Sequence, residues 1–168
     1  MQRVGQLDIQ ETGERELLFT RHFNAEPAKV FRALTKPSLI KRWLLGPPGW
    51  TMPECDVDLR VGGDYRYVWA HEDGRKMGMG GTFREIIADQ KIVHTELFDE
   101  DWTGGETLCT MVLTPQAGGT LYTLTVLYSS HEARTKALAV GMVAGMEHSY
   151  SVLDAVLAES GGELLRKP

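Results

Sequence analysis

His94 and Glu96 are the side chains best placed to do chemistry in this sequence. They are two residues apart in a segment, 91–98, that reads as a β-strand, so they share one face with Cβ atoms about 6 to 7 Å apart. An imidazole beside a desolvated carboxyl could exchange protons with one substrate, as a cyclisation, dehydration or hydrolysis requires. If that face is wet, the pair is instead an ordinary polar pair on a strand.

A second group of residues is apolar or aromatic and is expected on inward faces. It comprises Trp43, Tyr65, Tyr67, Trp69, Phe83, Phe98, Met111, Met142, Met146 and Tyr150. Such a set either fills a dry core or lines a pocket of several hundred Å³, in which methionines adapt to variable apolar guests and phenols orient a head group. We expect the pocket, with His94 and Glu96 in its wall. Arg66 and Arg84 have the opposite parity and are expected on the outer face.

Other kinds of site are not indicated. Asp99, Glu100, Asp101 and Glu106 lack the spacing of a calcium loop, and the other histidines lack zinc-ligand spacing. Cys55 and Cys109 lie in alternating segments outside any CxxC motif, which favours inert packing. We therefore expect neither a metal nor a cofactor.

Two short helices should follow the first strand, 17–23. Pro27 and Pro37 supply the fixed φ favoured at a first helical position, so residues 28–34 and a segment from Pro37 to Trp43 are predicted to be helical. The GPPG sequence at 46–49 ends the second helix.

The middle of the chain reads as strands separated by turn residues, at 54–60, 64–71, 79–87, 91–98, 107–114 and 120–128. Short connections imply antiparallel neighbours, and the first strand makes about seven. Ser129 and Glu132 form a capping box, and Gly161-Gly162 is a stop, so one long helix is expected from about Ser130 to Glu159.

Length and composition fit one soluble domain. The chain has 168 residues, 42% hydrophobic and 24% charged, with a net charge of −5, which gives no basic footprint for nucleic acid. We expect a polar segment over 1–15, which could hold an extra strand, one domain over 16–160 and a tail over 161–168. The absence of a signal peptide or membrane-spanning run predicts a cytoplasmic protein.

The order of these elements resembles the α+β helix-grip fold, also called START or Bet v 1-like. Residues 19–27 (FTRHFNAEP), 30–37 (VFRALTKP) and 58–67 (DLRVGGDYRY) resemble the family named for the activator of heat-shock protein 90 ATPase. So do residues 77–86 (MGMGGTFREI), 92–96 (IVHTE), 145–147 (GME) and 150–153 (YSVL), where many relatives have Trp in place of Tyr150.

The resemblance implies an apolar cavity between the curved sheet and the final helix, where related domains hold lipids, sterols, polyketides or hormones. We expect binding of a small hydrophobic or amphipathic molecule by a monomer or weak homodimer. Three alternatives stay open: a cofactor-free enzyme using His94 and Glu96, a stress-related protein associated with a chaperone, and an interaction module acting through Gly141 and Gly145. The family name describes co-chaperones with a separate chaperone-binding domain, for which 168 residues leave no room.

Overall fold

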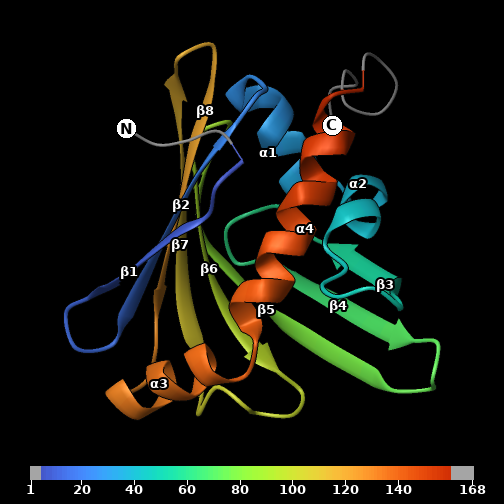
Figure 1. Cartoon of the computed structure of the whole chain (residues 1–168), viewed down its shortest axis with the longest axis vertical. Coiled ribbons are helices and arrows are strands. Elements are labelled where there is room, and N and C mark those ends of the chain that lie inside the picture. The colour runs from blue at the N-terminus through green and yellow to red at the C-terminus, as the bar shows by residue number, and fades with distance from the viewer. Residues whose placement is uncertain (1–4, 160–168) are drawn as a thin grey trace.

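The computed structural model describes residues 5–159, which form an α+β fold with one curved antiparallel sheet and a long helix across its concave face (Figure 1). The strands are β1 (Asp8–Thr12), β2 (Glu16–Phe23), β3 (Trp50–Val57), β4 (Asp64–His71), β5 (Lys76–Ile87), β6 (Lys91–Phe98), β7 (Thr107–Gln116) and β8 (Gly119–Leu127). The helices are α1 (Pro27–Thr35), α2 (Pro37–Trp43), α3 (His131–Ala139) and α4 (Met142–Leu157). The predicted fold class is confirmed. The predicted stop at Gly161-Gly162 and the tail 161–168 lie outside the described residues.

The sheet has eight strands within the described residues, rather than about seven, in the order β1-β2-β8-β7-β6-β5-β4-β3. The additional strand is β1, which pairs antiparallel with β2 from Asp8 opposite Thr20 to Thr12 opposite Glu16. Between β5 and β6 the backbones approach closely at Gly81, where an added Cβ would lie 1.9 Å from the carbonyl oxygen of Thr95. Gly81 thus permits the local curvature of the sheet.

The strand predicted over 54–60 is shifted, because β3 spans Trp50–Val57. Residues 58–63 form a turn in which the amide of Gly63 donates to the carbonyl of Arg60 and the amide of Gly62 donates to Phe83. Gly63 packs so tightly beneath the Asp58 carbonyl that an added Cβ would be 2.2 Å from it. This turn returns the chain to β4.

The two short helices form as predicted. Each begins with a proline at its first turn, and the indole nitrogen of Trp43 on α2 donates a hydrogen bond of 2.8 Å to the Ala33 carbonyl on α1. The loop after α2 is also fixed, because the indole of Trp69 donates to the carbonyl of Leu44 at 2.7 Å. The helices thereby close one end of the concave face (Figure 1).

The single helix predicted from Ser130 to Glu159 is wrong, since the chain forms α3 and α4 with a break between them. Gly141 precedes α4 with φ of +79°, a left-handed conformation that ends α3 and redirects the chain. The capping residue also differs, because the Ser130 hydroxyl accepts from Ala133 while Ser129 donates to the Gly104 carbonyl. In residues 5–159, no helix is long and apolar enough to cross a membrane.

Contacts along its length hold α4 against the rest of the domain. The guanidinium of Arg21 on β2 donates to both carboxylate oxygens of Asp154, and the hydroxyls of Tyr150 and Tyr122 lie 2.7 Å apart. A Cβ added at Gly145 would lie 3.7 Å from Cδ of Pro47, so this glycine faces the α2–β3 loop rather than the sheet. These contacts fix the helix over the concave face of the sheet.

Candidate functional site

The alternation of β6 places His94 and Glu96 on the concave face. The His94 ring packs edge-on against Tyr65, with centroids 5.3 Å apart, and Glu96 Oε2 lies 3.9 Å from the sulfur of Cys109. Leu97 between Glu96 and Phe98 is 42% exposed on the outer face. Of the two orientations that the sequence allowed, the structure therefore has the inward one.

Two oxygens surround Nδ1 of His94 and determine its tautomer. The Tyr65 hydroxyl is 3.1 Å from Nδ1 and donates its own proton to the Thr95 carbonyl, which lies 3.2 Å from the same nitrogen. Both oxygens can accept from His94, so the network assigns the hydrogen to Nδ1 and leaves the lone pair on Nε2. Burial lowers the pKa of His94, which favours the neutral ring.

Glu96 and Cys109 are an acid and a thiol in contact. Burial raises the pKa of Glu96 to about 7, although its contact with Cys109 opposes the shift, and burial also raises the pKa of Cys109. The hydroxyl of Thr107 lies 3.8 Å from the Cys109 sulfur and donates to the Glu96 carbonyl at 3.3 Å. Cys109 is 2% exposed, whereas His94 and Glu96 keep partial exposure.

The sequence analysis predicted that Cys109 packs inertly in the interior, and it did not predict that the thiol lies beside Glu96 and His94. In the β6–β7 ladder His94 lies opposite Cys109 and Glu96 lies opposite Thr107. Only the register of the β6–β7 hairpin would have indicated this contact. The loop of residues 99–106 separates the two strands in the sequence, and the alternation of side chains does not determine how they pair.

The predicted wall residues divide into two groups. Trp43, Tyr65, Trp69, Phe83, Met111 and Tyr150 are buried in the main hydrophobic core. Tyr67, His94, Glu96, Phe98, Met142 and Met146 are only partly buried. Tyr67 and Glu96 are far enough from bulk water that burial raises their pKa values, yet both keep accessible surface.

The interior consists of two buried clusters instead of one continuous core. The larger contains Trp43, Tyr65, Trp69 and Tyr150, and the smaller contains Phe19, Cys109, Tyr128 and Ala137. Leu124 on β8 and Met146 on α4 pack against both clusters and are themselves only partly buried. We call these two residues and their surroundings the seam.

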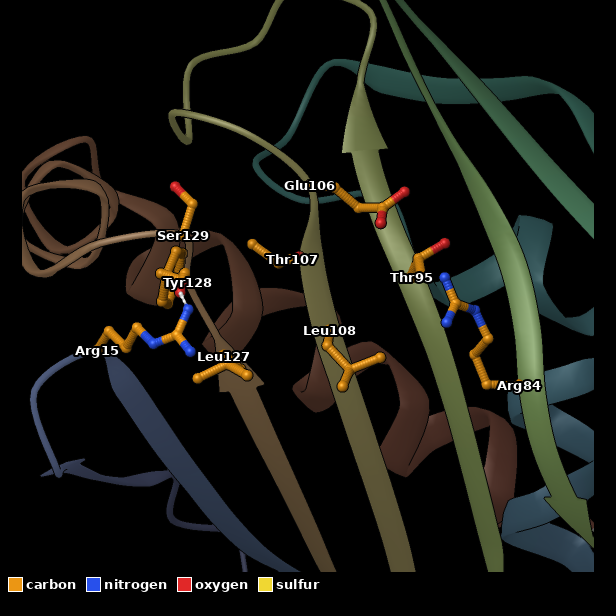
Figure 2. A pocket seen from close by; sticks show the side chains of 9 residues that line it. All are labelled: Arg15, Arg84, Thr95, Glu106, Thr107, Leu108, Leu127, Tyr128 and Ser129. Carbon is orange, nitrogen blue, oxygen red and sulfur yellow. Dashed lines mark hydrogen bonds between the residues drawn. The ribbon is translucent and has the colours of Figure 1, made fainter.

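Two hollows lie away from the seam. One of about 200 Å³ is drawn in Figure 2, where Arg84 and Glu106 both extend toward Thr95. Its other lining residues are Arg15, Thr107, Leu108, Leu127, Tyr128 and Ser129. The second, of about 470 Å³, lies on the outer face of β4 and β5 and includes Arg66, Leu97 and Asp99. A cavity at the concave face therefore stays a prediction.

The outer arginines and the acidic hairpin are explained by surface contacts. Arg66 makes two hydrogen bonds to the carboxylate of Asp99, at 2.9 and 2.7 Å, which lower the pKa of Asp99. Glu100, Asp101 and Glu106 are exposed, and Arg84 is exposed as well. As predicted, both arginines lie on the outer face.

Comparisons with known proteins agree on one family. The model of the family described as "Activator of Hsp90 ATPase homolog 1-like protein" matches residues 24–158. A crystal structure of a Rhodobacter sphaeroides protein is 38% identical, covers 91% of this chain and 99% of its own, and has a TM-score of 0.86. No protein with a curated description matches this chain.

Two further solved structures share the fold. A solution structure from Arthrobacter aurescens is 27% identical, covers 97% of this chain and 96% of its own, and has a TM-score of 0.80. The solution structure of an AHSA1-like protein from Aeromonas hydrophila is 21% identical, covers 88% and 97%, and has a TM-score of 0.71.

Proposed function

This chain belongs to the Activator of Hsp90 ATPase homolog 1-like family, and from that premise we propose that it binds a small hydrophobic or amphipathic molecule between the sheet and α4. The fold supports a ligand-binding domain of the START and Bet v 1-like superfamily. Fold alone does not specify an activity, so the proposal depends on the side chains at the concave face.

The observation that carries the proposal is the seam. Leu124 and Met146 contact two separate buried clusters and still keep accessible surface. We infer that the accessible surface of these two side chains faces a space between the clusters, since a filled interior would leave few voids as large as a water molecule. Met146 has an unbranched thioether, which adapts to guests of different shape.

From the distribution of burial we infer that the proposed space lies toward one end of α4. In the middle of the helix, Tyr150 is packed among Trp43, Phe23 and Tyr122 and is only 5% exposed, and Leu153, Val156 and Leu157 are buried from there to the C-terminal end. Toward its N-terminal end, Met142 and Met146 are partly buried. The ligand would therefore lie beside the first two turns of α4.

Three polar side chains suit an amphipathic ligand. Tyr67, His94 and Glu96 are partly accessible and offer a hydroxyl, an imidazole and a carboxyl group on the concave face. Apolar pockets use a few such groups to orient a ligand and to select it. We infer that the apolar part of the molecule contacts Met146 and Leu124 and that its polar end meets the side chains of β6.

The test is native mass spectrometry of freshly purified protein, in which a retained small molecule is expected. Met146→Trp should fill the space and abolish the mass shift of the bound molecule. Leu97→Trp, on the outer face of β6, should keep that mass shift. Loss of the mass shift in Leu97→Trp with retention in Met146→Trp would place the ligand in the outer hollow and overturn the proposal.

A second candidate is a cofactor-free cyclase, dehydratase or hydrolase. It is favoured by the shared inward face of His94 and Glu96 on β6. His94→Gln and Glu96→Gln separate it from pure binding. Unaltered ligand affinity with loss of turnover would support the enzyme, and unaltered turnover in both variants would exclude it.

A further inference from the structure

Three side chains of different metal-binding chemistry meet on the concave face. One ligand atom from each of His94, Glu96 and Cys109 lies within 4.8 Å of the others. Zinc holds nitrogen and oxygen ligands at about 2.0 to 2.2 Å and sulfur at about 2.3 Å, so ligand atoms around one tetrahedral zinc ion are about 3.3 to 3.8 Å apart. The Cys109 sulfur and Glu96 Oε2 are already 3.9 Å apart, so small side-chain movements would bring the three ligand atoms to that spacing. We propose that His94, Glu96 and Cys109 form a binding site for a divalent transition-metal ion of the zinc class.

The donor set selects this class of ion. A thiolate together with an imidazole suits zinc and its neighbours in the first transition series, whereas magnesium and calcium prefer oxygen ligands alone. One thiolate and one carboxylate also supply two negative charges, which match a doubly charged ion in a site where unpaired charge is costly. Three protein ligands leave a fourth tetrahedral position open to the interior, the arrangement of catalytic zinc sites.

Neighbouring groups already orient the ligands as metal sites require. Metal-binding histidines commonly donate their second ring N–H to a carbonyl or another acceptor. Here Nδ1 of His94 faces the Thr95 carbonyl at 3.2 Å and the Tyr65 hydroxyl at 3.1 Å, which leaves Nε2 as the free nitrogen. On the other strand, Thr107 Oγ1 lies 3.8 Å from the Cys109 sulfur.

Strand pairing explains why the site is preorganised in the fold. His94 and Cys109 are directly opposite in the β6–β7 ladder, and Glu96 follows two residues later on the same face. The three ligands therefore come from a continuous part of the sheet rather than from loops. A metal site goes beyond ligand binding. It also makes His94 and Glu96 metal ligands, whereas the cofactor-free enzyme would use them as acid and base.

The test uses the full chain, stripped with a chelator and titrated with Co²⁺ alone. A thiolate-to-cobalt charge-transfer band should grow to one equivalent and disappear when Zn²⁺ is added. Cys109→Ser should abolish the band, and His94→Gln or Glu96→Gln should weaken Co²⁺ binding by more than about tenfold. The matched control is Cys55→Ser, which removes the other buried cysteine and should keep the band.

X-ray absorption of the Zn²⁺-loaded, unmutated chain provides a readout that depends on no variant. It should show one sulfur at about 2.3 Å and nitrogen or oxygen ligands at about 2.0 Å. No charge-transfer band, a band that survives Cys109→Ser, or a zinc shell without sulfur would overturn the metal site. None of these results bears on the retained small molecule, so the two proposals fail separately.

Discussion

Arg21 on β2 and Asp154 on α4 form a two-pronged ion pair, with guanidinium nitrogens 2.7 Å from each carboxylate oxygen. Arg21 is 3% exposed, and its guanidinium also lies 4.7 Å from the centre of the Phe23 ring. The pair joins the helix that covers the concave face to the sheet beneath it. The two residues are 133 positions apart in the sequence, so no local signal predicts their contact.

Asp154→Asn should destabilise the domain by about 2 to 3 kcal/mol, because it leaves the Arg21 charge buried without its partner. Breaking a fully buried pair costs about 3 to 5 kcal/mol, and the smaller value reflects the 41% exposure of Asp154. Denaturant unfolding measures the change. The control is Glu159→Gln, which breaks the solvent-exposed pair with Arg42 and should destabilise the domain far less. Equal effects of the two substitutions would contradict this account.

Gly141→Ala tests the break between α3 and α4. Gly141 has φ of +79° and an added Cβ would meet open space, so the substitution strains only the backbone and should cost about 1 kcal/mol. Gly145→Ala lies inside α4, where the new Cβ would be 3.7 Å from Pro47, and should be neutral or stabilising by up to about 1 kcal/mol. If thermal unfolding shows that Gly141→Ala also stabilises, the two helices are continuous.

The stability of the metal-free protein should fall as pH rises through the titration of Glu96. Burial raises the pKa of Glu96 from 4.5 to about 7. The stabilising contribution of the protonated carboxyl is therefore fully present below pH 4.5 and is lost as pH rises from there through 7. Tyr67 and Cys109, which face Glu96, have raised pKa values, and that of His94 is lowered, so all three stay neutral near pH 7.

Urea midpoints between pH 5 and 8 measure this effect. Glu96→Gln should flatten the decline over that range, because a buried amide does not ionise. Glu106→Gln removes an exposed carboxylate of the neighbouring strand end and should leave the decline unchanged. A decline of the same size in Glu96→Gln would show that another group is responsible.

Local sequence signals predicted most of the fold, because each depends on residues close together in the chain. Prolines at the first turns located α1 and α2, and alternation placed Tyr65, Tyr67 and Trp69 on one face of β4. His94 and Glu96 were likewise predicted to share a face, since strand geometry alone requires it.

Features that depend on distant residues or on one backbone angle were not predicted. The meeting of Cys109 with Glu96 depends on the register between β6 and β7. An extra strand within residues 1–15 was among the expectations, but its antiparallel pairing with β2 was not. The helix break depends on one positive φ at Gly141, whereas a glycine within an apolar periodic pattern equally suits a continuous helix.

The space at the seam is tested most directly by a crystal of the purified protein under xenon pressure, since xenon enters apolar cavities and marks their position. We expect xenon, or the density of a retained molecule, in contact with Met146 and Leu124 between the sheet and α4. Density confined to the outer face of the sheet, or a seam closed to xenon with no molecule in it, would contradict the proposed function.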